Sequence, residues 1–150
     1  MIAASVGFDL LFLVHVLAAV ATITVVVVMR AGATTGASGA DAVVQRRRFP
    51  ARRNWAARVV HLLVLSGLAM SITGASSDSI RRPFVIVGLL CYLAIAGHLE
   101  ARTLPLERVV ADEIARDGVA EVAKGRQLAR SVDVIGALLA VALVSMIVQF

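Results

Sequence analysis

The sequence predicts an all-α membrane protein whose four transmembrane helices form an up-down-up-down bundle in a single domain, residues 1–150. Hydrophobic residues make up 59% of the chain and charged residues 17%, and the mean hydropathy is +0.88. A soluble domain is typically about 45–50% apolar and about 25% charged. Apolar runs long enough to cross a bilayer occur at about residues 8–30, 55–75, 83–103 and 130–150, because a helix of about 20 residues matches a hydrocarbon core of about 30 Å.

The first apolar run, Leu10 to Met29, is twenty residues long. The apolar core of a signal peptide is usually about 7 to 15 residues long, so we expect an anchoring helix. The segment AGATTGASGA at residues 31–40 has no hydrophobic period and predicts a flexible joint. Its Gly32 and Gly36 form a GxxxG pattern, which outside an apolar span indicates only loop composition.

The joint after the first span is strongly basic and predicts the orientation in the membrane. Its sequence QRRRFPARRNWAAR, residues 45–58, holds six arginines within thirteen residues. Residues 30–58 hold seven Lys or Arg and residues 102–130 hold six, against two at residues 81 and 82. Positive joints face the cytoplasm, so the charge distribution predicts a multi-pass protein with both termini outside the cytoplasm. We expect it in the bacterial cytoplasmic (inner) membrane, with both termini periplasmic or extracellular.

The net charge of +5 does not indicate nucleic-acid binding, because the arginines flank membrane spans. The expected partners are the lipid bilayer and, where the protein is part of a complex, other membrane protein subunits.

The second and third spans are predicted to be antiparallel neighbours, since only the short segment at residues 76–82 separates them. Gly67, Ser71 and Ala75 repeat every four residues on the second span and predict a smooth face against another helix. The third span begins at Pro83, which suits the first turn of a helix.

Between the third and fourth spans, residues 104–130 predict a short cytoplasmic helical hairpin. Leu106, Val110 and Ile114 recur at helical spacing, and Asp117 and Gly118 interrupt the pattern. Residues 100–130 carry six basic and six acidic side chains. Because these charges cancel in sum, the segment is not expected to be a strong anchor for anionic lipids.

Few residues are candidates for chemistry. His61 and His98 are expected at one depth, near the cytoplasmic end of their spans, because each lies about five residues inside that end. The candidate polar cluster at this level consists of Arg58, His61, His98, Glu100 and Asp133. Such a cluster either fixes helix order through interhelical bonds or forms a proton, metal or haem site.

A haem b group, if one is bound, would use His61 and His98 as its ligands. His15, near the outer end of the first span, is expected to bond to a backbone carbonyl or to a threonine of a neighbouring helix. A second ligand pair is His15 with Met70, because a His/Met pair binds haem or copper in other proteins.

Four segments resemble a bacterial family of predicted four-helix integral membrane proteins of unknown function: LVHVLAAVATI, RRRFPARRNWAARVVHLLVLSGLAM, RRPFVIVGLLCYLAIAGHLEARTLPLERV and the final apolar helix. The Leu-x-His opening is also distantly similar to copper-resistance CopD-like proteins and to HemJ-type protoporphyrinogen oxidases. Those relatives usually carry a Trp-Gly pair after the histidine, where this chain has Ala21, Thr22 and Ile23. The oxidases need a lysine within the membrane, and the only lysine here is Lys124, in a predicted joint.

Two classes of function remain open from the sequence. No nucleophile elbow, phosphate loop, HExxH or CxxC motif is present, so the first class is a non-enzymatic accessory, assembly or small-solute-handling component. The alternative is a haem- or metal-binding membrane redox protein that uses the intramembrane histidines.

Overall fold

The computed structural model describes residues 2–49, 54–73 and 81–148. Within them the chain is helical and contains no strand. Four of the helices are long and apolar enough to cross a membrane. The elements in chain order are α1 (Ile2–Ala37), α2 (Ala42–Arg48), the short 3₁₀ helix η1 (Ala56–Arg58), α3 (Val59–Thr73), α4 (Pro83–His98), the π-helical turn η3 (Leu99–Thr103), α5 (Leu104–Asp117) and α6 (Val122–Val148).

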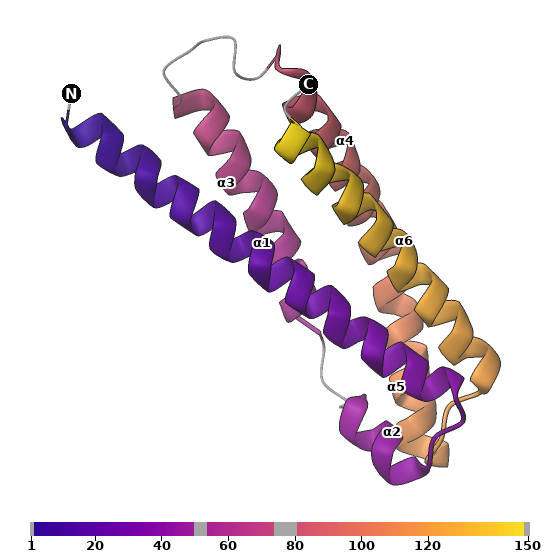
Figure 1. Ribbon diagram of the computed structural model, residues 1–150. Helices are drawn as coiled ribbons and strands as arrows, with labels where there is room; N and C mark the ends of the chain where they lie inside the picture. Colours follow the sequence, from indigo (N-terminus) through magenta and orange to yellow (C-terminus); the bar gives the residue numbers. More distant parts are fainter. Residues whose placement is uncertain (1, 50–53, 74–80, 149–150) are drawn as a thin grey trace.

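In the bundle, α1 packs along both α3 and α6, and α4 packs along α6 (Figure 1). The beginning of α1 and the end of α6 lie at one end of the molecule, and α2 and α5 lie at the other (Figure 1). The largest buried side chains gather toward the α2 and α5 end, where Ile95, Ile114 and Leu128 are almost fully buried. Each of the four long helices exposes large apolar side chains, such as Leu10, Leu65, Leu90 and Val144, as expected for contact with lipid.

The predicted flexible joint at residues 31–40 is wrong over most of its length, because α1 continues to Ala37. Hydroxyl groups of Thr34, Thr35 and Ser38 donate hydrogen bonds to backbone carbonyls of the preceding turn. The two glycines of the GxxxG pattern also have packing roles. Gly32 lies against the Phe49 ring, and Gly36 lies against both Phe49 and the backbone of Gly125. Tertiary contacts therefore override the weak helix propensity of this composition.

The turn into α2 follows the helix directly. Gly39 has a φ of +69°, a conformation that glycine adopts without strain. Asp41 then caps α2, accepting a hydrogen bond from the Val44 amide at 3.0 Å. Gly118, with a φ of +86°, ends α5 in the same left-handed conformation.

The third apolar span continues into α5 without a break in helix. Pro105 has no amide hydrogen and its ring would clash with the Ala101 carbonyl of a regular helix. The wider π turn at Leu99–Thr103 precedes this proline and accommodates it. Charged residues such as Glu107, Asp112 and Glu113 lie on α5, beyond the apolar part of this run.

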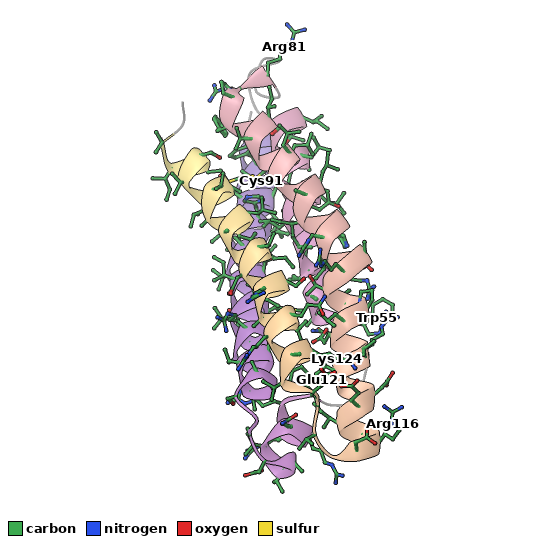
Figure 2. The ribbon with its side chains drawn as sticks, turned by 90° about the vertical axis from the view of Figure 1, so that its right-hand side faces the viewer. Trp55, Arg81, Cys91, Arg116, Glu121 and Lys124 are labelled. Carbon is green, nitrogen blue, oxygen red and sulfur yellow. The ribbon has the colours of Figure 1, made fainter. Side chains whose placement is uncertain are left out.

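Helix α6 begins at Val122, earlier than the predicted start near residue 130. Its first turns are tied to α5, where Lys124 forms an ion pair with Glu113. Figure 2 shows α6 beside the run of helix from α4 to α5, with Glu121 and Lys124 toward the α5 end. Several predicted features lie outside the described residues: Ala75, Arg52, Arg53 and residues 76–80 of the predicted outer joint.

Candidate functional site

The intramembrane polar residues form separate contacts between pairs of helices. In the first contact Arg58, at the end of η1, donates from Nη2 to Glu100 Oε2 on η3 at 2.7 Å. The guanidinium also lies 4.9 Å from the centre of the Trp55 ring, a distance that allows a cation–π interaction. The Arg58 side chain is only 18% exposed, so the carboxylate of Glu100 neutralises a charge that is largely removed from solvent.

His61, one turn after Arg58, extends this contact toward α4. Its Nδ1 lies 3.0 Å from the Tyr92 hydroxyl, and its Nε2 lies 3.9 Å from Glu100 Oε1. The imidazole and phenol rings meet edge to face, with centroids 5.9 Å apart. Arg58, His61, Tyr92 and Glu100 therefore connect the start of α3 with α4 and η3.

His98 belongs to a different contact. Its Nε2 lies 2.9 Å from the Ser131 hydroxyl on α6 and 3.2 Å from the Ser131 carbonyl. The same hydroxyl lies 2.8 Å from Thr103 Oγ1. Thr103 and Ser131 are both buried, so this group links η3 to α6 in the interior.

Asp133 has its partner outside the candidate polar cluster. Its Oδ1 accepts from Arg30 Nε of α1 at 2.5 Å. The structure therefore brings together Arg58, His61 and Glu100, and it distributes His98 and Asp133 to separate partners on α6 and α1.

His15 packs against α3. Its Nδ1 lies 3.1 Å from Ser66 Oγ, and a side chain at Gly67 would meet the imidazole at 2.9 Å. The prediction that Gly67 faces another helix is confirmed, and that helix is α1. Met70 lies one turn farther along α3 and is half-buried; the partner of His15 is the serine.

The three histidines thus have three different partners: Ser66, Tyr92 and Ser131. Two haem-ligating histidines must face each other across a gap wide enough for the macrocycle, whereas His61 turns toward α4 and His98 turns toward α6. Among the residues that the structure describes, no group of three or more His, Cys, Asp or Glu side chains is placed to hold a metal ion.

Outside the apolar spans, two acidic residues of α5 have shifted pKa values. Burial raises the pKa of Glu107, against the opposing effect of the Asn54 amide, whose Nδ2 donates to its carboxylate at 3.0 Å. The hydrogen bond from Lys124 lowers the pKa of Glu113, and the same bond raises the pKa of Lys124. Glu113 and Lys124 are therefore both charged at neutral pH, which stabilises the turn between α5 and α6.

Several polar residues with evident roles were not predicted from the sequence. Tyr92, Thr103 and Ser131 are uncharged and common in membrane helices, so nothing in their spacing indicates a contact. Gln45 is 1% exposed although it stands next to three arginines. Its Nε2 donates to the Ala40 carbonyl at 2.7 Å, and its Oε1 accepts from the Ala120 amide at 2.9 Å.

Comparisons with protein-family models, with curated proteins and with solved structures gave no match for this chain.

Proposed function

We propose that the protein is a non-enzymatic component of the bacterial cytoplasmic membrane that acts as an accessory, assembly or small-solute-handling protein. One observation carries this proposal: the histidines and the charged residues of the candidate polar cluster are each engaged in a contact between helices. Hydrogen bonds between membrane helices contribute about 0.6 kcal/mol each on average. Several of them fix the helix order, and an ordered bundle suits a protein that presents a constant surface to a partner subunit.

The proposed topology is an up-down-up-down bundle with residues 104–130 as a cytoplasmic hairpin. The thirteen-to-two distribution of Lys and Arg supports this orientation, and the common position of the beginning of α1 and the end of α6 is compatible with it (Figure 1).

Single cysteines test the orientation in a Cys91→Ser background, which removes the only native thiol. We expect a membrane-impermeant maleimide to label Arg81→Cys on intact spheroplasts. Labelling of Asp117→Cys should require permeabilised cells. Both side chains are exposed on the surface of the protein. A difference in labelling between the two positions therefore reports on which side of the membrane each one lies. Labelling of Asp117→Cys on intact spheroplasts would reverse the proposed orientation.

The structural role predicts energetic coupling between Arg58 and Glu100. In a double-mutant cycle with Arg58→Gln and Glu100→Gln, we expect each single variant to be destabilised and the double variant to lose less than the sum. A coupling free energy of about 1 to 1.5 kcal/mol is expected, near the upper end for polar contacts between membrane helices. Unfolding of the purified protein in mixed micelles measures it.

The same preparation discriminates between the two classes of function. A reduced-minus-oxidised absorption spectrum without a Soret band, together with a stoichiometric protein partner, is the expected result. A Soret band that disappears in His61→Ala or His98→Ala would instead establish the haem-binding redox protein.

A further inference from the structure

A groove of about 580 Å³ lies between the α4 to η3 run and the first half of α6. This volume is within the usual range for ligand sites, about 300 to 1,000 Å³. Its lining residues form one stripe on each of the two helical runs: His98 and Arg102 on one, and Ala123, Arg126, Gln127, Arg130, Ser131 and Val134 on the other. The groove faces the surroundings of the bundle, since the three arginine side chains are exposed.

The charge of this groove has one sign. Arg102, Arg126 and Arg130 line it, and no carboxylate does. Among the described residues these three arginines take part in no hydrogen bond or ion pair, whereas Arg30 and Arg58 each have a carboxylate partner. The charges of residues 100–130 cancel in sum, as the sequence shows, but they are separated in space.

The acidic side chains nearby are engaged elsewhere. Glu113 and Glu121 both contact Lys124, Asp133 contacts Arg30, and Glu100 contacts Arg58. Three arginines that line one hollow without a carboxylate partner favour an external anion. The planar fork of guanidinium donors matches the oxygens of a phosphate group.

The position of the groove along the bundle indicates whether its phosphate ligand is a lipid or a soluble compound. Arg126 and Arg130 come just before the apolar part of α6, which continues to Val148. Val134, at the apolar end of the groove, is 45% exposed, and farther along the same two helices Leu90 of α4 and Val141 of α6 are 62% and 53% exposed. A ligand seated here would meet cations at one end and an apolar surface at the other.

We propose that this groove binds the phosphate group of an anionic phospholipid, whose acyl chains lie along the exposed apolar side chains of α4 and α6. Basic pockets between membrane helices at the interface bind anionic headgroups in this way. The proposal rests on membrane insertion of the bundle and does not depend on which side faces the cytoplasm or on whether the protein is an enzyme.

Native mass spectrometry of the detergent-solubilised protein, with added phosphatidylglycerol or phosphatidylcholine, tests the proposal. We expect retained phosphatidylglycerol in clear preference to phosphatidylcholine. The triple variant R102Q/R126Q/R130Q should bind phosphatidylglycerol about 100-fold more weakly, because each cation near the membrane surface contributes about fivefold in affinity. The triple variant with lysine at the same positions should retain most of the binding, which separates loss of charge from loss of fold.

The matched control is R46Q/R47Q/R48Q, which removes three exposed arginines from α2 and changes the net charge equally. Its affinity for phosphatidylglycerol should stay within about threefold of the unmodified chain, since the proposal assigns binding to the groove and not to net charge. Equal losses in the two glutamine variants would overturn the groove as a site. Competition by inorganic phosphate or glycerol phosphate at concentrations similar to that of the lipid would overturn the lipid assignment and indicate a soluble anion.

Discussion

Gly125→Ala is expected to destabilise the bundle by about 3 kcal/mol, at the upper end of the usual cost of overpacking a core. A side-chain carbon at this position would lie 2.5 Å from the Ala37 nitrogen and from the Gly36 carbonyl carbon. The opposing atoms are backbone atoms of α1, which cannot change rotamer as a side chain can. The end of α1 and the beginning of α6 would have to separate, and the contacts of Phe49 with Gly32 and Gly36 would be disturbed with them.

Thermal unfolding in detergent, followed by the fluorescence of Trp55, measures this effect. Gly97→Ala is the matched control, because a side-chain carbon at Gly97 meets nothing within 4 Å. That substitution should be neutral or slightly stabilising, since alanine has the higher helix propensity. Equal melting temperatures for Gly125→Ala and the unmodified chain would show that α1 and α6 do not approach this closely.

The long apolar helices were predictable because lipid imposes one rule on the sequence: a segment of about 20 apolar residues must be helical to satisfy its backbone. The helix ends were less predictable, because outside the apolar spans the ends depend on tertiary contacts. Residues 31–37 have a loop-like composition, and they are helical because Gly36 packs on Gly125 and three hydroxyl groups bond to the helix backbone. The sequence of residues 31–37 alone does not indicate that Gly125 is the residue that lies against Gly36, or how closely the two helices approach there.

The candidate polar cluster was likewise predictable only in part. Depth along a span can be estimated by counting residues from its end, and this reasoning places Arg58, His61 and Glu100 at one level, where the structure brings them together. Counting residues does not give the rotation of each helix about its axis, and this rotation decides which neighbour a side chain meets. In the structure His98 faces Ser131 of α6, and Asp133 faces Arg30 of α1. The i,i+4 spacing of Arg126 and Arg130 indicates that these two arginines share one face of a helix. Arg102, on the other side of the groove, comes from another helix, so the groove itself could not be predicted from this spacing.

Gln45→Met is expected to destabilise the α2 and α5 end of the bundle by about 3 kcal/mol. Methionine fills a similar volume but forms no hydrogen bond with the Ala120 amide or the Ala40 carbonyl, the two groups that Gln45 now satisfies. A buried polar group without a partner costs about 1 to 3 kcal/mol. Ala120 is 7% exposed, so water replaces the glutamine poorly at that amide.

Hydrogen exchange identifies the cause of this loss. In Gln45→Met the Ala120 amide should exchange faster, whereas the amides in the middle of α6 should keep most of their protection. Arg46→Met is the control, since Arg46 is the next residue of α2 and its side chain is exposed; its stability should change by less than about 0.5 kcal/mol. If Gln45→Met is as stable as this control and protects Ala120 equally, the glutamine does not hold the turn before α6. The loss we expect has a simple structural basis, because one side chain joins the segment before α2 to the segment before α6, and the intervening chain alone does not keep these two segments together.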